Sequence, residues 1–223
     1  MGLEEWEGSI FGVEGFKDRK NRDTYRMLKG EEGERTCVEN GVEYSLRVGD
    51  GFSVGLFLDT SLLREYVKGL EGRCLNLFSH GNAIAKAKGG EGVNVDLSEK
   101  YFQRVEGWKN IVDDVWDYCK RKGGKESFDV VVCDPPSSSV GKKRRWSTLK
   151  DYPELITLLT PLVSSSGLLI LCSNTKKQSR NEFLKQCEKG FEMAGRKGVL
   201  ERVLGTEWGW WTEGVKIFVW RLE

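Results

Sequence analysis

Apolar runs of strand length alternate with amphipathic segments along the chain from residue 73 onward. The runs are rich in Val, Ile and Leu, and most of them end in polar or charged residues. Such runs are typical of strands that are buried on both faces of a parallel sheet. They lie at 73–78, 92–95, 110–112, 130–132, 167–171, 199–204 and 215–220.

The segments between these runs predict helices. Ser179 and Glu182 have the spacing of a capping box, which predicts a helix that runs to Met193. Pro153 falls in the first turn of a second predicted helix, where its missing N–H is tolerated. The other helices are expected at 83–88, 97–108, 113–119 and 149–163. Strands that alternate with helices predict an α/β fold with a mainly parallel sheet and right-handed crossovers.

The N-terminal third has a different character. Residues 1–35 are rich in glycine and charge and show little periodicity, so we expect a poorly specified extension there. Asn40-Gly41 separates two β-type runs and predicts a hairpin, because both turn positions need a positive φ. An extended piece at 55–58 and a helix start at 61–67 follow. The expected divisions are therefore 1–35, a β-hairpin extension over 36–70, and an α/β domain over 71–223.

The run at 130–132 ends in Cys133-Asp134-Pro135-Pro136. The two prolines fix φ and remove two backbone donors, so Asp134 is expected in a stiff, extended exit from the strand. Ligand chemistry in open α/β sheets lies at the carboxyl ends of strands, which makes Asp134 a candidate site residue. The alternative is a strand followed by a proline-stiffened turn without chemistry.

Acids also follow the predicted strands at 92–95 and 110–112. The run at 73–78 leads into the Gly-containing segment Ser79-His80-Gly81-Asn82, and the next run, at 92–95, closes in Asp96. This order is the layout of a nucleotide-binding half. In that layout the acid at the second strand's end binds ribose hydroxyls; alternatively, Asp96 caps the predicted helix at 97–108. Asp113-Asp114 follow the third strand, where an acid can accept a bond from an adenine amino group or stabilise a helix N-terminus.

The densest basic cluster directly follows the Asp134 turn and comprises Lys142, Lys143, Arg144 and Arg145, next to Trp146. Cations beside an aromatic ring suit RNA phosphates and a stacked base, although charge runs more commonly form solvated loops. The Trp208–Trp211 aromatic cluster is expected to pack near the sheet edge. The formal net charge is +1, so any affinity for nucleic acid must come from such local patches.

The composition excludes several classes of protein. No apolar run reaches the length of a membrane span, and the acidic start resembles neither a signal peptide nor a transit peptide. The six cysteines form no C-x-x-C pair and there is one histidine, so neither a metal site nor a disulfide framework is expected. We expect a reducing compartment, the cytoplasm or an organelle. Oligomeric state is not predicted.

Taken together, the motifs resemble a known family. GLFLD at 55–59, LNLFS at 75–79, KGGEGVNVDLS at 88–98, FDVVVCDPPSSS at 128–139, LKDYPEL at 149–155 and GLLILCSN at 167–174 occur in the same order. They look like the class I S-adenosylmethionine-dependent methyltransferases related to the bacterial large-subunit ribosomal RNA enzymes that make 5-methylcytosine or 7-methylguanine. The resemblance covers about residues 36–222 and implies a Rossmann-like seven-stranded sheet with a small N-terminal β extension.

The resemblance also implies roles for individual residues. Catalytic residues at the methyl group would be Asp134, Pro135 and Pro136. S-adenosylmethionine would be bound by Phe78, Ser79, His80, Gly81, Asp96, Leu97, Asp114, Val115 and Asp134. Ribosomal RNA is the partner that the resemblance implies, and the basic cluster Lys142–Arg145 described above is expected to bind its phosphates. The sequence departs from the family where His80-Gly81-Asn82 follow LFS and where the segments before KGG and after Asp96 are short.

Two functions of different classes follow from these observations. The first is methylation of a base in RNA; the second is a degenerate methyltransferase fold that acts as a non-catalytic RNA-binding or assembly module. If the protein is an enzyme, we expect direct transfer without a covalent cysteine intermediate. Relatives that make 5-methylcytosine have a Cys after the serine that ends the fifth strand, and here Asn174 follows Ser173. Cys172 and Cys133 are expected to be small buried hydrophobes that point away from the site.

Overall fold

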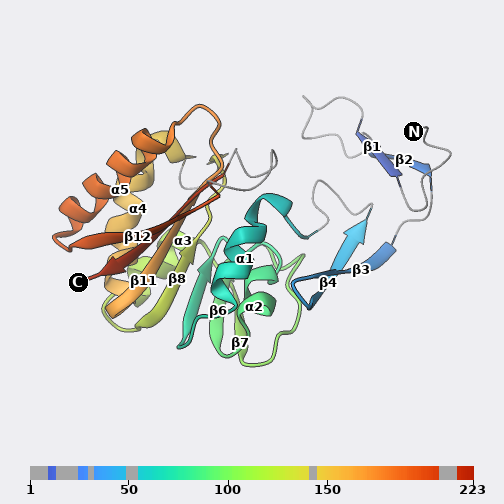
Figure 1. Cartoon of the computed structure of the whole chain (residues 1–223), viewed down its shortest axis with the longest axis horizontal. Helices are drawn as coiled ribbons and strands as arrows, with labels where there is room; N and C mark the ends of the chain where they lie inside the picture. Colours follow the sequence, from blue (N-terminus) through green and yellow to red (C-terminus); the bar gives the residue numbers. More distant parts are fainter. Residues whose placement is uncertain (1–9, 14–24, 30–32, 49–54, 141–144, 206–214) are drawn as a thin grey trace. The chain divides into compact units, whose positions relative to one another are not determined.

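The computed structural model describes residues 10–13, 25–29, 33–48, 55–140, 145–205 and 215–223. The chain divides into two compact units, 1–57 and 58–223, which are considered separately below. Figure 1 shows the elements of both units. The predicted Trp208–Trp211 cluster lies outside the described residues.

The first unit consists of two antiparallel strand pairs. β1 (Ile10–Val13) pairs with β2 (Tyr25–Lys29), and β3 (Gly33–Glu39) pairs with β4 (Val42–Val48). The second pair is the predicted hairpin: Asn40 and Gly41 in its turn have φ values of 51° and 75°, as a two-residue turn of this kind requires. β1 and β2 were not expected, because each is short and lacks a clear alternation of apolar and polar residues.

The second unit is built on a seven-stranded sheet with the strand order β12-β13-β11-β8-β5-β6-β7. β7, β6, β5, β8 and β11 are mutually parallel, and β13 runs antiparallel between β11 and β12. This order confirms the predicted Rossmann-like seven-stranded sheet. The strands are β5 (Cys74–Leu77), β6 (Gly92–Asp96), β7 (Trp108–Val112), β8 (Phe128–Cys133), β11 (Val163–Ser173), β12 (Gly198–Leu204) and β13 (Lys216–Leu222).

Alternate residues of the central strands pack into two separate cores, one on each face of the sheet. Val131 and Cys133 face one core, and Val130 and Val132 face the other, which explains the unbroken apolar run at this strand. The first core is covered by α3 (Val115–Lys122), α4 (Thr148–Leu159) and α5 (Arg180–Ala194), as Figure 1 shows. The second lies under α1 (Ser61–Val67) and α2 (Ala83–Lys88).

Most helix predictions are confirmed. The capping box of Ser179 and Glu182 is present at the start of α5. The predicted helix at 149–163 ends earlier, since α4 is followed by a short 3-10 turn, η4 (Thr160–Leu162), and by β11. Residues 58–60 form another 3-10 turn, η3 (Leu58–Thr60), where an extended piece was expected to end. No helix of the described residues is long and apolar enough to cross a membrane.

The predicted helix at 97–108 is wrong. Residues 97–107 connect β6 to β7 through turns, and β7 begins at Trp108. Gln103 supplies a carbonyl that accepts bonds from the side-chain amides of Asn82 (2.5 Å) and Asn110 (3.0 Å). Side chains that bind a backbone carbonyl compete with helical hydrogen bonds, and this segment is held by them instead.

A ladder of asparagine side chains links three neighbouring strands of the sheet. Asn76, Asn94 and Asn110 lie in register on β5, β6 and β7. The Asn76 amide donates to the Asn94 oxygen at 2.9 Å, and the Asn94 amide donates to the Asn110 oxygen at 3.0 Å. Asn76 and Asn94 are buried, so these bonds satisfy polar groups that would otherwise be costly.

Candidate functional site

The polar residues singled out in the sequence meet at the carboxyl edge of the sheet. β5 lies between β6 and β8 in the sheet. After β5 the chain adds β6 and β7 on one side of that strand and then crosses over to add β8 and β11 on the other side. Such a switch point in a parallel sheet opens a crevice outside the strand ends. Asp96 ends β6, Asp134 follows β8, and the loop 78–82 follows β5. The tertiary fold therefore brings together residues that are up to 56 positions apart in the sequence.

The loop after β5 has an unusual backbone. Phe78, His80 and Asn82 have φ values of 57°, 48° and 40°, in the left-handed region that residues other than glycine seldom adopt. The loop is held to β6 by the Ser79 N–H, which donates to the Val95 carbonyl at 3.2 Å. Three such residues in five positions store strain, and strain of this kind concentrates at ligand sites.

Asp96 is held by backbone donors on both sides. Its Oδ2 accepts the N–H of His80 at 3.0 Å, and its Oδ1 accepts the N–H of Ser98 at 2.9 Å. An ionised carboxylate can accept about four bonds, so each oxygen retains a lone pair. Leu97 beside it is 66% exposed, which leaves an apolar side chain next to the acceptor. A sugar with vicinal hydroxyls and an attached ring fits this pair of residues.

His80 packs against an aromatic residue that sequence reasoning missed. Its ring lies 4.3 Å from that of Tyr101, centroid to centroid, at an angle of 32°. Burial and the Lys100 charge lower the pKa of His80, while the Asp96 carboxylate opposes them. Tyr101 belongs to the connection that was expected to be helical, so nothing in its local sequence pointed to this loop.

Asp114 caps α3, as one of the two interpretations held. Its Oδ1 accepts the N–H groups of Trp116 (2.9 Å) and Asp117 (3.2 Å). Within the described residues its Oδ2 has no hydrogen-bond partner, so capping does not exhaust the carboxylate. Val115, the other residue implied at this position, is buried in the core.

Asp134 lies in an environment that disfavours its charge. Burial, and then the nearby charge of Asp59, raise the pKa of Asp134 to about 7. Burial also raises the pKa of Asp59, and the Arg64 charge opposes that shift. Arg64 is 2% exposed and donates to the Thr60 hydroxyl at 2.8 Å. The site therefore contains a second carboxyl group, Asp59, whose position beside Asp134 the sequence did not reveal.

The exit from β8 is pinned in place. Pro135 is buried, and the Pro136 carbonyl accepts the Trp146 indole N–H at 2.6 Å and the Thr148 hydroxyl at 3.2 Å. Ser137 is exposed, and its hydroxyl donates to the Asn174 side-chain oxygen at 2.5 Å. The stiff turn predicted from the prolines is thus tied to α4 and to the end of β11.

The two cysteines near the site are buried, as expected. Cys133 and Cys172 are both fully buried, and they belong to cores on opposite faces of the sheet. Burial raises the pKa of both thiols well above the usual range, and the Asp134 charge adds to this at each. Neither thiol is suited to ionise and act as a nucleophile.

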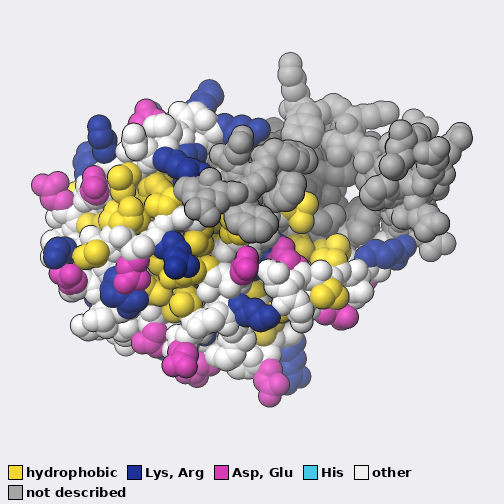
Figure 2. Space-filling model, viewed as in Figure 1, with side chains coloured by type: hydrophobic (Ala, Val, Ile, Leu, Met, Phe, Trp, Pro, Cys, Tyr) yellow, Lys and Arg dark blue, Asp and Glu magenta, His cyan; other side chains and the backbone are white. Residues whose placement is uncertain are grey.

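The predicted RNA-contacting cluster falls mostly outside the described residues, which include only Arg145 of its four cations. Arg145 is exposed and begins β10 (Arg145–Ser147), which pairs with β9 (Ser138–Val140). On the face shown in Figure 2, the described surface carries interspersed basic and acidic side chains rather than a broad basic field. The described residues contain no cluster of His, Cys, Asp or Glu that could hold a metal ion.

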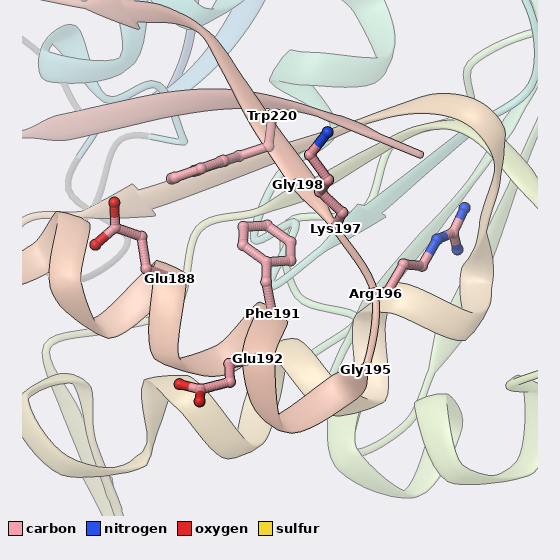
Figure 3. A pocket seen from close by; sticks show the side chains of 8 residues that line it. All are labelled: Glu188, Phe191, Glu192, Gly195, Arg196, Lys197, Gly198 and Trp220. Carbon is pink, nitrogen blue, oxygen red and sulfur yellow. The ribbon is translucent and has the colours of Figure 1, made fainter.

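A hollow of about 340 Å³ lies at the opposite edge of the sheet (Figure 3). It is lined by Phe191 and Trp220 from α5 and β13 and by charged residues around the start of β12. Lys197 there pairs with Glu223, and Arg196 donates to the carbonyls of η4 and β11. These cations are already used in structural bonds, so the chemistry of the molecule points to the carboxyl edge instead.

Comparisons with known proteins show which proteins the chain resembles. No family model matches the sequence. The chain is 31% identical over 183 residues to the ribosomal RNA large subunit methyltransferase K/L of Hydrogenovibrio crunogenus, covering 71% of this chain and 24% of that protein. It is 30% identical over 188 residues to the ribosomal RNA large subunit methyltransferase I of Aeromonas salmonicida, covering 74% and 46%. The chain thus spans less than half the length of these curated relatives.

Solved structures share the fold. The crystal structure of SMU.776 complexed with SAH matches with a TM-score of 0.78 and 26% identity, over 89% of this chain and 59% of that one. The SAM-dependent methyltransferase from Agrobacterium tumefaciens matches with a TM-score of 0.70 and 18% identity, over 96% and 76%. The chain therefore has the class I S-adenosylmethionine-dependent methyltransferase fold and is related in sequence to the bacterial large-subunit ribosomal RNA methyltransferases.

Proposed function

We propose that the protein is an S-adenosylmethionine-dependent methyltransferase that acts on a base of RNA, and that this RNA is ribosomal. The observation that carries the proposal is that three features meet at the switch point: the strained loop 78–82, Asp96 with its two backbone donors, and the partly buried Asp134 with its raised pKa. The related ribosomal RNA methyltransferases support the substrate class. A ribosomal substrate places the protein in the cytoplasm or in an organelle that has ribosomes.

The residues present fit the cofactor. Asp96 retains lone pairs for the two ribose hydroxyls, and Leu97 offers an apolar surface beside it. The second oxygen of Asp114 and the backbone of Val115 would read the adenine edge. The loop from Phe78 to Gly81 would follow the methionine part. When bound, the cofactor supplies an electrophilic methyl group, and the protein has only to bind and orient the acceptor base.

Asp134 and the two prolines would hold that base. The stiff turn fixes the backbone at the point of transfer, and its bonds to Trp146 and Thr148 keep it from relaxing. With a pKa near neutrality, Asp134 can accept or share a proton with the target group. A nitrogen target has its own lone pair, whereas cytosine C5 needs a thiolate at C6. The buried cysteines and the exposed Asn174 favour a nitrogen target.

The test is isothermal titration with S-adenosylmethionine, followed by transfer of a labelled methyl group to unmodified large-subunit ribosomal RNA. We expect binding by the wild type and a loss of roughly 1.5–3 kcal/mol in Asp96→Ala, the value of a charge-assisted hydrogen bond. Glu99→Ala, an exposed acid of the adjoining loop, is the matched control. Equal affinity in wild type and Asp96→Ala would refute the ribose assignment. No binding by either would favour the non-catalytic module.

A further inference from the structure

Lys216 is a buried lysine with few partners. It is the first residue of β13 and is 5% exposed. Its ammonium group has three N–H donors, and among the described residues the acceptor that it meets is the Thr175 carbonyl, at 3.0 Å. The described residues place no carboxylate in a salt bridge with it. Burial and then the Arg180 charge lower the pKa of Lys216, so its surroundings do not compensate its charge.

The Thr175 hydroxyl next to it is also buried and unsatisfied. Thr175 is 8% exposed, and its Oγ1 has no hydrogen-bond partner. A buried polar atom without a partner is costly, and native proteins keep few of them. An ammonium that uses one of its three donors in the described bonds and an unpartnered hydroxyl thus belong to residues that are already in contact.

These two residues adjoin the proposed site of methyl transfer. Lys216 lies opposite Ser173 in the β11–β13 pair, so it marks the carboxyl end of β11. Asn174, between Ser173 and Thr175, accepts the hydroxyl of Ser137 from the turn that follows Asp134. Lys216 and Thr175 are therefore connected, through Asn174 and Ser137, to the turn that would hold the target base.

A purely structural role does not account for Lys216. Its bond to the Thr175 carbonyl could be made by an uncharged donor. Taking a cation out of water is costly, and within the part of the chain that the structure describes no carboxylate forms a salt bridge with Lys216. By contrast, Lys88 in α2 also donates to a single carbonyl in a described bond, that of Gly72, but it has no unsatisfied hydroxyl beside it. Among the described residues, Lys216 is distinguished by the unpartnered Thr175 hydroxyl beside it at the carboxyl edge.

We propose that Lys216 Nζ and Thr175 Oγ1 form a subsite that binds an oxygen acceptor of the target nucleotide, and that this acceptor is a carbonyl of the flipped base. The inference rests on the proposed function and adds a specificity-determining contact to it. Both groups are buried, which suits a base inserted in a pocket and read by hydrogen bonds. A phosphate offers the same oxygen chemistry but stays at the hydrated backbone. Bases without a carbonyl at that position would be disfavoured.

The experiment compares Lys216→Met, which keeps the length of the side chain, and Thr175→Val, which keeps its shape, with wild type. Lys197→Met is the control, since Lys197 is an exposed lysine at the opposite edge of the sheet. Methyl transfer to unmodified, in vitro transcribed large-subunit ribosomal RNA is measured together with cofactor affinity and the salt dependence of RNA binding. We expect kcat/KM for RNA to fall about tenfold or more in each subsite variant, as loss of one buried hydrogen bond predicts.

We expect the cofactor affinity of both subsite variants to stay within about twofold of wild type. An unchanged kcat/KM in either folded variant would overturn the subsite, as would a parallel loss of cofactor affinity. Should Lys216→Met fail to fold, Thr175→Val alone decides. If a subsite variant reduces the slope of log RNA affinity against log salt by roughly 0.7, the acceptor is a phosphate, and the assignment to a base carbonyl is overturned. Absence of cofactor binding and transfer in the wild type would refute the proposed function, and the subsite with it.

Discussion

The Ser137 hydroxyl donates to the Asn174 side-chain oxygen at 2.5 Å. This bond joins the turn after Asp134 to the residue that follows the fifth parallel strand. Asn174 is exposed and is held there, whereas Cys172, two residues earlier, is fully buried. The side chain beside the proposed point of methyl transfer is therefore an amide and not a thiol.

We predict that RNA containing 5-fluorocytidine forms no covalent complex with the protein. This nucleotide traps a thiolate that has added to C6, but burial and the Asp134 charge raise the pKa of Cys172 well above its usual range. Incubation with cofactor and denaturing electrophoresis make the measurement, with Cys172→Ser as the matched variant. A complex that forms in wild type and disappears in Cys172→Ser would restore the cytosine mechanism.

We predict that Asp134→Asn is more stable than wild type at pH 8 but not at pH 4, while losing methyl transfer. The folded pKa of about 7 lies above the ordinary value of 3.8, so the unfolded chain binds fewer protons between these values. The free energy of unfolding that protonated Asp134 contributes in the wild type is present at pH 4 and is lost as the pH rises through 7. Asparagine does not ionise, so the variant does not lose stability in this way. Thermal unfolding at both pH values tests this.

The control for that measurement is Glu99→Gln, at an exposed acid of the loop 97–107. A stability difference between Asp134→Asn and wild type that is the same at pH 4 and pH 8 would contradict the raised pKa. Asp59→Asn gives a second check, because removal of the Asp59 charge is expected to lower the pKa of Asp134.

We predict that Asn94→Ala lowers the free energy of unfolding by about 1–3 kcal/mol. Asn94 is fully buried and bonds both neighbours in the ladder, so its removal leaves the Asn76 amide without its acceptor. Urea denaturation measures the effect, and Lys109→Ala, at an exposed residue of β7, is the comparison. Equal stability of the two variants would show that the ladder contributes little.

We predict that neutralising Lys142, Lys143, Arg144 and Arg145 together weakens RNA binding and flattens its salt dependence. Each single-strand phosphate contact that is lost reduces the slope of log affinity against log salt by roughly 0.7. Neutralising four lysines outside the cluster, Lys120, Lys150, Lys189 and Lys197, is the charge-matched control. A slope that changes equally in both variants would make the cluster an ordinary solvated loop.

Local sequence determined much of the fold. The Asn40-Gly41 turn, the capping box of Ser179 and the buried strand at 130–132 were readable because each depends on residues close together in the chain. The strand pattern also predicted Asp96 and Asp134 as candidate site residues. The ends of parallel strands share one edge, so the strand pattern alone predicts that acids placed there will meet.

Only the tertiary structure decided what surrounds those acids. The connection at 97–107 is not helical because the side chains of Asn82, just before α2, and of Asn110 in β7 donate to the Gln103 carbonyl. No local sequence pattern encodes such contacts between distant segments. The same is true of the Asp59 charge near Asp134 and of the Lys216 bond to Thr175, which spans 41 positions. Burial and electrostatic coupling depend on packing between distant segments, and so the chemistry of the site emerges only when the sheet is assembled.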